Sequence, residues 1–158
     1  MQKLIEQLRG EGFEGFVTVS QLTNNPDMVR ADGGVYLVLY GGDEMPEFRE
    51  VGTGGHFKDK DPNVAIEDLK LNWVAGERIL YIGKAESLRR RLRQYMKFGN
   101  GEDVGHWGGR LIWQIADAQN LTVCWKHTDE NPREVEKRMI AEFKNGHNGL
   151  RPFANLQG

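Results

Sequence analysis

The chain has 158 residues, a net charge of −2 and one cysteine. This length predicts one domain, residues 1–158, with a substantial core, and the single Cys124 excludes an internal disulfide. No apolar run approaches the ~20 residues of a membrane span, and no basic-then-apolar segment begins the chain. We therefore expect a cytoplasmic protein with no membrane partner.

The first half of the chain contains one clear strand. "GVYLVLY" at 34–40 is rich in β-branched and aromatic residues and follows a glycine pair. We expect Asp61 to cap a helix that starts at Pro62 and runs to about Trp73. The other predicted segments of this half are a helix at 2–9, a short strand or turn at 16–22 and a glycine-rich, charged loop at 41–60.

The second half alternates strands with helices. Its predicted elements are a strand at 78–82, a helix at 86–97, a glycine-rich loop at 98–109, a strand at 121–125 and a helix from Asn131-Pro132 to about Lys144. Periodicity does not decide between helix and strand for residues 110–116. Strands interleaved with helices predict an α/β (α+β) domain, with a small mixed sheet on which helices pack.

Charge is distributed unevenly along the chain. Residues 1–77 sum to −7, residues 78–110 to +5 and residues 111–158 to 0, which together give the net −2. A local basic block on a mildly acidic protein favours a focused site for an anionic ligand over a broad nucleic-acid-binding coat.

Two tyrosines are predicted to meet on one face of the sheet. Side chains alternate along a strand, so Tyr36, Val38 and Tyr40 share a face, as do Ile79 and Tyr81. If the two strands pair, Tyr36 and Tyr81 lie close together. The alternative is that both are ordinary half-buried strand tyrosines without a function.

The basic helix at 86–97 has a clean apolar stripe. At 100° per residue, the stripe comprises Leu88, Leu92, Tyr95 and Met96. Arg89 and Arg91 lie at its two edges, where an arginine can bury its stem and present its guanidinium to a phosphate. Arg90 and Arg93 point away from the stripe. The alternative for all four is a solvated helix face.

Glu136 occupies an unusual position on the last helix. The same angular calculation places it within the apolar face formed by Val135, Met139 and Phe143, whereas Glu134 falls on the polar side. A carboxylate on a packing face is costly unless it is paired or binds a metal. Glu136 is therefore either a functional acid or one partner of a buried salt bridge.

Taken together, these residues resemble the GIY-YIG nuclease superfamily over residues 33–156. The matching elements, in chain order, are "GVY" at Gly34–Tyr36, "YIG" at Tyr81–Gly83, Arg91 eight residues after Gly83, "EKRMI" at Glu136–Ile140 and "PFAN" at Pro152–Asn155. The resemblance implies a mainly antiparallel three-stranded central sheet flanked by helices. It also implies hydrolysis of DNA phosphodiester bonds with one divalent ion, Mg²⁺ or Mn²⁺.

The resemblance also implies roles for individual residues. Glu136 is the only protein ligand of the metal, and Arg91 stabilises charge on the phosphate. Tyr36, or failing that Tyr81, orients or deprotonates the attacking water. Asn155 supports the site by hydrogen bonding.

Further residues complete the expected site. Gly83 is expected to allow a close backbone approach. Lys84 is placed to lower the pKa of a catalytic tyrosine, with a solvated lysine as the alternative. The residues expected to contact nucleic acid are Arg89, Arg90, Arg93, Tyr95, Lys97 and Arg110.

The chain departs from the family pattern in two places. Many members have a histidine one helical turn after the arginine, where this chain has Tyr95, whose phenol can bond to water or phosphate. The spacing between Tyr36 and Tyr81 implies an insertion at 41–76, after an N-terminal extension at 1–32. Within the insertion, the candidates for DNA contact are His56, Lys58 and Lys60, although an ornamental loop is the alternative.

The histidines are scattered and have no metal-ligand spacing, so we predict no zinc site. These histidines are His56, His106, His127 and His147. "GHWGGR" at 105–110 lines the cleft or else contributes a core tryptophan. The leading prediction is a metal-dependent DNA endonuclease. The alternatives are a catalytically weak nucleic-acid-binding module and a nuclease subunit that needs a partner.

Overall fold

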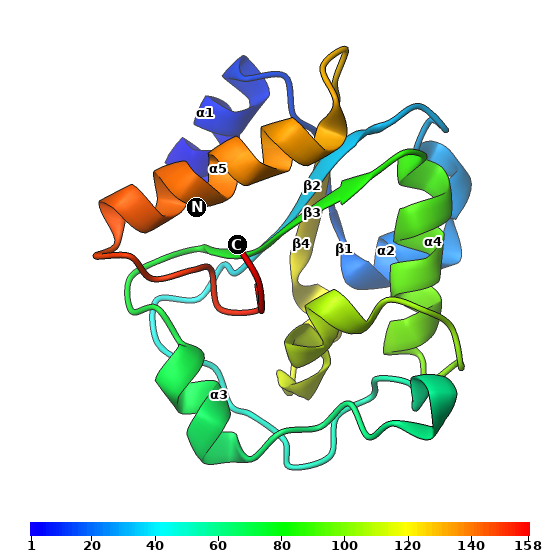
Figure 1. Cartoon of the computed structure of the whole chain (residues 1–158), viewed down its shortest axis with the longest axis vertical. Coiled ribbons are helices and arrows are strands. Elements are labelled where there is room, and N and C mark those ends of the chain that lie inside the picture. The colour runs from blue at the N-terminus through cyan, green and yellow to red at the C-terminus, as the bar shows by residue number, and fades with distance from the viewer.

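The computed structural model describes all residues, 1–158, and contains one four-stranded sheet (Figure 1). Its strands are β1 (Glu14–Thr18), β2 (Gly34–Leu39), β3 (Ile79–Ala85) and β4 (Thr122–His127). They lie in the order β1-β4-β2-β3, and every neighbouring pair is antiparallel. The mixed α/β class and the antiparallel pairing are as predicted, but the sheet has four strands rather than three, because residues 14–18 add β1 at one edge.

Helices cover both faces of this sheet. The α-helices are α1 (Gln2–Gly10), α2 (Val19–Asn24), α3 (Ile66–Asn72), α4 (Leu88–Gly99) and α5 (Pro132–Gly146). The 3-10 helices are η1 (Pro26–Met28), η2 (Phe57–Asp59), η3 (Trp107–Gln114) and η4 (Ala118–Asn120). In Figure 1, α1 and α5 lie on one side of the sheet, and α2 and α4 lie on the other. None of the helices combines the length and apolarity that crossing a membrane requires.

The alternation of side chains along β2 divides the interior into two cores. All of β2 is buried because helices cover it on both sides. Tyr36 and Val38 belong to the larger core, with residues of α2, α4 and η3. Val35, Leu37 and Leu39 belong to the smaller core, with residues of α1 and α5. The period of two that the sequence shows therefore fixes which β2 side chains face α4.

Local sequence signals explain the starts of the two main helices. Ser87 caps α4 by accepting from the Arg90 N–H at 3.4 Å. Asn131 caps α5 and Pro132 occupies its first turn, as predicted. Residues 110–116, which the sequence left open, lie mostly in the 3-10 helix η3.

Two predicted boundaries were wrong. Residues 16–22, expected to be a short strand or turn, are divided: β1 ends at Thr18, because Thr18 and Gln21 form a capping box that starts α2. Asp61 does not cap a helix. Its carboxylate accepts from the Asn63 N–H at 2.9 Å in a local turn, and α3 begins only at Ile66.

The insertion at 41–76 is an integral part of the domain. Gln114 on η3 is 1% exposed, and its amide bonds to the backbone of the insertion at two places. Its Nε2 donates to the carbonyls of Arg49 (3.0 Å), Glu50 (3.3 Å) and Val64 (2.9 Å). Its Oε1 accepts from the Val64 N–H at 2.9 Å. The insertion is thus bound to the same 3-10 helix that follows His106.

Candidate active site

Most of the predicted catalytic side chains line one pocket. This pocket has a volume of about 320 Å³ and is lined by Tyr36, Tyr81, Lys84, Ala85, Glu86, Arg91 and Glu136. The residues come from β2, β3 and its following turn, α4 and α5. Segments more than 40 residues apart in sequence are therefore brought together at the end of the β2–β3 pair where α4 and α5 begin.

Tyr36 and Tyr81 meet as expected, on the sheet face that α4 covers. Tyr36 is opposite Gly83 in the ladder and Tyr81 is opposite Val38, so the two tyrosines are diagonal neighbours. Their ring centroids are 6.0 Å apart. A Cβ at Gly83 would overlap the Tyr36 ring. The space at Gly83, which we expected to admit a close backbone, is filled by Tyr36.

Arg91 lies at the edge of this pocket, half-buried. Its Nη1 donates to the Gly105 carbonyl at 2.8 Å and to Gln94 Oε1 at 3.3 Å. The Gly105 bond fixes the loop before η3 against α4. The guanidinium is charged and close enough to the buried rings to oppose the rise in the pKa of Tyr36 and Tyr81.

Glu136 lines the pocket and does not lie within the core. It is half-buried, whereas its neighbours Val135 and Ile140 on α5 are buried. The ion pairs of the structure do not include Glu136, so the alternative of a buried salt bridge is not formed. Partial burial raises the pKa of Glu136, and the charges of Lys84 and Arg133 act against that rise. The angular calculation on the helix correctly marked Glu136 as unusual, but it overestimated how deeply the Glu136 side chain is buried.

The donor set at this pocket fits a hard cation bound through one carboxylate. No three histidine, cysteine, aspartate or glutamate side chains gather anywhere in the structure to form a cage. Mg²⁺ nevertheless keeps several waters and often takes only one or two carboxylates plus substrate phosphate oxygens. Glu136, unpaired and facing the pocket, meets that requirement, and Glu86 lines the same pocket.

Asn155 does not line the pocket but supports its floor. The side chain is buried, and its amide bonds to both the N–H and the carbonyl of Ile82. Its Oδ1 accepts from the Ile82 N–H at 2.9 Å, and its Nδ2 donates to the Ile82 carbonyl at 2.9 Å. Because Ile82 lies between Tyr81 and Gly83, Asn155 fixes the strand that carries them.

Tyr95 and His106 form an internal cluster with the two site tyrosines. Tyr95 is 0% exposed, and its hydroxyl donates to the Gly109 carbonyl at 2.8 Å. Tyr95 therefore does not contact nucleic acid in this conformation, contrary to expectation. His106 stacks on its ring with centroids 3.8 Å apart. His106 Nε2 is 2.5 Å from the Tyr36 hydroxyl oxygen.

Sequence reasoning missed His106. The prediction of no zinc site rested on the lack of metal-ligand spacing, and the same scatter concealed a contact with Tyr36 across 70 residues of chain. The one available signal was the position of "GHWGGR" directly after the basic helix.

Burial keeps the four rings of this cluster uncharged. Desolvation raises the pKa of Tyr81 to about 12 and raises the pKa values of Tyr36 and Tyr95 well above their ordinary value. Burial, reinforced by the charge of Arg91, lowers the pKa of His106 well below its ordinary value. At neutral pH the pocket therefore presents uncharged tyrosine hydroxyl groups beside the side chains of Arg91, Lys84 and Glu136.

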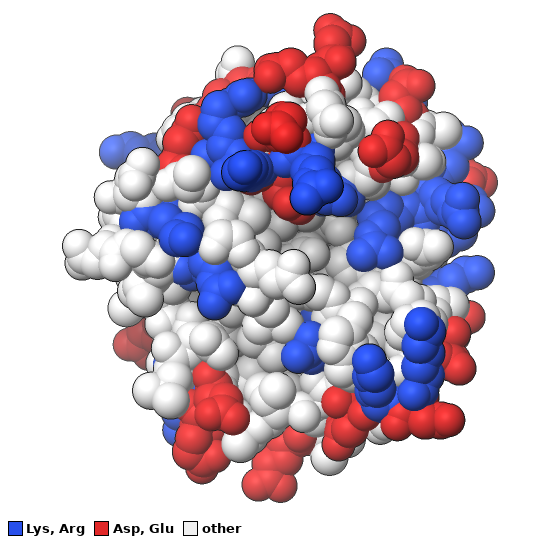
Figure 2. Space-filling model, viewed as in Figure 1, with Lys and Arg blue, Asp and Glu red and all other residues white.

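Of the side chains predicted to contact nucleic acid, some are bonded within the protein and others are exposed. Arg89 donates from Nε to the Val29 carbonyl at 2.6 Å, and Arg93 pairs with Asp27 at 2.9 Å. Both hold the segment around η1 against α4. Arg90 and Lys97 are exposed. In Figure 2 basic side chains gather on the right of the view, over α4.

Arg110 and the insertion surround Trp107. The guanidinium carbon of Arg110 is 4.6 Å from the Trp107 ring centroid, and the Lys60 ammonium is 5.9 Å from it. Lys58 lies over Phe57, and His56 is 3.8 Å from the Asp61 carboxylate. These side chains thus have aromatic or acidic neighbours within the protein.

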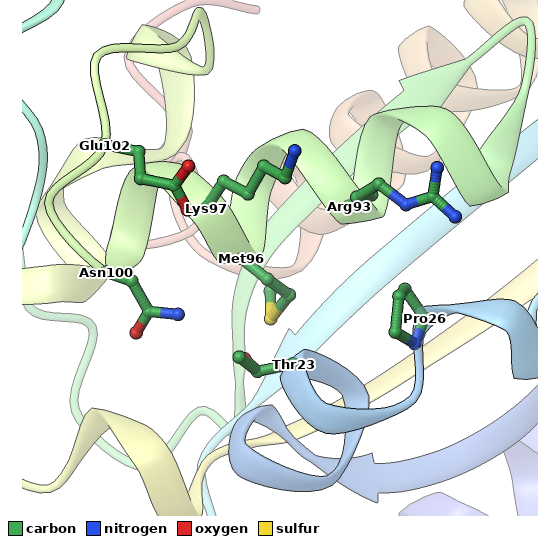
Figure 3. A pocket seen from close by; sticks show the side chains of 7 residues that line it. All are labelled: Thr23, Pro26, Arg93, Met96, Lys97, Asn100 and Glu102. Atoms are coloured by element: carbon green, nitrogen blue, oxygen red, sulfur yellow. The ribbon is translucent and has the colours of Figure 1, made fainter.

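A second pocket, of about 460 Å³, lies between α4 and the α2–η1 segment (Figure 3). Arg93 and Lys97 line it from α4, and Thr23 and Pro26 face them. Although larger, it contains none of the predicted catalytic side chains. The smaller pocket at Glu136 is therefore the candidate active site.

Comparisons of the chain with protein-family models, curated proteins and solved structures found no match. A proposal of function therefore rests on the residues of the pocket and their geometry.

Proposed function

We propose that this chain is a metal-dependent endonuclease that hydrolyses phosphodiester bonds in DNA. The observation that carries the proposal is the convergence of Tyr36, Arg91 and Glu136 on one small polar pocket from three separate elements. Phosphodiester hydrolysis needs an oriented water, a cation on the phosphate and a stabilised leaving oxygen. The pocket contains side chains suited to each of these tasks.

The roles follow from the chemistry of each side chain. Glu136 would hold Mg²⁺ or Mn²⁺, and the bound ion supplies Lewis-acid stabilisation of the phosphate and the leaving oxygen. Arg91 presents a guanidinium whose planar donors match phosphate oxygens. Lys84, exposed at the pocket, adds a second positive charge. Tyr36 orients the attacking water through its hydroxyl group.

The exposed cations of α4 supply attraction to the DNA backbone. Arg90 and Lys97 are the free members of the predicted set, since Arg89 and Arg93 are already bonded within the protein. Contacts of this kind add affinity without reading sequence. Arg110, beside Trp107, extends the positive surface toward the insertion.

The test is cleavage of supercoiled plasmid with Mg²⁺, Mn²⁺ or EDTA. We expect metal-dependent nicking that falls by about 10²-fold or more in Glu136→Gln and Arg91→Ala, in line with loss of a group that stabilises transition-state charge. The matched control is Glu134→Gln, because Glu134 is exposed on the same helix and does not line the pocket.

Two results would overturn this proposal. If Glu136→Gln still cleaved DNA, the assignment of Glu136 as the metal ligand would be wrong. Absence of cleavage by the wild type on duplex, branched and single-stranded DNA would favour the alternatives. Gel-shift binding would then support a nucleic-acid-binding module, and activity restored by a second protein would support a nuclease subunit.

A further inference from the structure

Tyr36 has a buried partner that the roles above do not use. The Tyr36 hydroxyl oxygen is 2.5 Å from His106 Nε2, and both side chains are almost fully buried, at 1% and 0% exposure. The other ring nitrogen, His106 Nδ1, has no hydrogen-bond partner. Tyr36 also lines the catalytic pocket, whereas His106 does not. The only hydrogen bond that links the His106 side chain to a pocket residue is therefore the one to the Tyr36 hydroxyl.

The surrounding structure holds His106 in this position from both sides. Arg91 bonds to the carbonyl of Gly105 at 2.8 Å, and Tyr95 bonds to the carbonyl of Gly109 at 2.8 Å. The loop that carries His106 is thus attached to α4 before and after the histidine. The Tyr95 ring supports the imidazole face, with an interplanar angle of 14°.

We propose that His106 is a positioning residue for Tyr36 and accepts the Tyr36 hydroxyl proton when Tyr36 activates the attacking water, an inference that rests on the nuclease function proposed above. In the resting state the Tyr36 O–H donates to Nε2, and the imidazole proton is on Nδ1. This tautomer leaves Nε2 as an acceptor.

The proton transfers and bond changes balance as follows. A proton passes from water to the Tyr36 oxygen while the original hydroxyl proton passes to His106 Nε2. The water oxygen forms the new bond to phosphorus, and the bond from phosphorus to the leaving sugar oxygen breaks. That oxygen keeps the electron pair and takes a proton from solvent. His106 later returns its proton to solvent through Tyr36.

This proton relay, from water through Tyr36 to His106, removes a difficulty that Tyr36 would have if it acted alone. Burial raises the pKa of Tyr36 well above its ordinary value, so a free phenolate is costly. In the relay Tyr36 gives up one proton as it receives another and never becomes charged. The groups that face His106 are Tyr36, Tyr81, Tyr95 and Arg91.

The positive charge that His106 gains in the relay is easier to form during the reaction than in the free protein. Burial and, after it, the charge of Arg91 disfavour an imidazolium in the free protein. Attack on the phosphate adds a negative charge to the pocket, which offsets the new positive charge on His106. The imidazolium is therefore favoured more in the transition state than in the resting state.

The first test is kinetic and uses a double-mutant cycle. Single-turnover nicking at saturating DNA is compared for wild type, His106→Gln, Tyr36→Phe and the double variant. Glutamine keeps a hydrogen-bond acceptor but cannot hold the proton. We expect the rate of His106→Gln to fall by about 10²–10⁴-fold with DNA affinity unchanged, and the substitution to have little further effect in Tyr36→Phe. Imidazole should partly restore activity to His106→Gly.

A His106→Gln rate within about 3-fold of wild type would overturn the relay, because general acid–base catalysis contributes at least about 10²-fold. A loss of rate that remains equally large in the Tyr36→Phe background would also overturn it, since His106 would then act by another route.

The second test does not depend on nuclease activity, and its deciding measurement uses the wild type alone. Nitrogen NMR of the wild type reports which His106 nitrogen carries the proton. We expect Nε2 to be unprotonated, and its shift to change in Tyr36→Phe. Protonated Nε2 would overturn the acceptor role even if the protein cleaves DNA. An unprotonated Nε2 in a protein that cuts no DNA would instead refute the nuclease proposal and leave the Tyr36–His106 pair standing.

Discussion

Replacing Gln114 by methionine tests how much one buried amide contributes to holding the insertion at 41–76, beside the backbone hydrogen bonds that also join the insertion to η3. Methionine is unbranched and close to glutamine in length, so it keeps most of the packing and removes only the hydrogen bonds. Gln114 makes four contacts of 2.9–3.3 Å with the backbone of Arg49, Glu50 and Val64. The substitution leaves one N–H and three carbonyl oxygens without that partner.

The expected cost follows from these groups. A buried donor or acceptor that loses its partner costs about 1–3 kcal/mol, and a carbonyl that water can reach costs less. Gln114 itself is buried, but the segments it binds are only partly so. One unsatisfied Val64 N–H together with the partly hydrated carbonyls gives a loss of about 2–4 kcal/mol in the free energy of unfolding.

Urea unfolding monitored by tryptophan fluorescence measures this loss. Gln119→Met is the matched control, because Gln119 is exposed and follows Gln114 by five residues. We expect the Gln114→Met midpoint to fall clearly while the control midpoint does not change. A loss below about 1 kcal/mol, the net value of one ordinary hydrogen bond, would refute the view that Gln114 holds the insertion to η3.

Two further predictions concern the tyrosine cluster. Gly83→Ala should cost about 1–3 kcal/mol of stability and should reduce nicking, because the added Cβ overlaps the Tyr36 ring. A thermal unfolding midpoint equal to that of the wild type would contradict the close packing of Tyr36 on Gly83. At high pH, the unfolded chain loses phenol protons from about pH 10, whereas the folded protein retains them on Tyr36, Tyr81 and Tyr95, whose pKa values are raised. The folded state then binds more protons, so its stability should fall as pH rises above about 10, by about 1.4 kcal/mol per pH unit for each tyrosine. Tyrosinate absorbance that appears before unfolding for all four tyrosines of the chain would show that burial does not protect the cluster.

The sequence determined those features that depend on local periodicity. A period of two placed Tyr36 and Val38 on one face of β2, and the caps Ser87 and Asn131 set the starts of α4 and α5. The apolar stripe of α5 identified Glu136 as out of place. These signals are encoded by neighbours in the chain, so they can be read without the fold.

Tertiary structure decided the environment of each of these side chains. Sequence could not show that Glu136 lies half-exposed at a pocket, because a helical wheel does not show where along its axis a helix leaves the core. Gly83 makes room for the Tyr36 ring across a strand pair that joins residues separated by the whole insertion. His106 reaches Tyr36 from a loop that Arg91 and Tyr95 bind to α4. Contacts between distant segments depend on how the layers pack, and no local pattern records that packing.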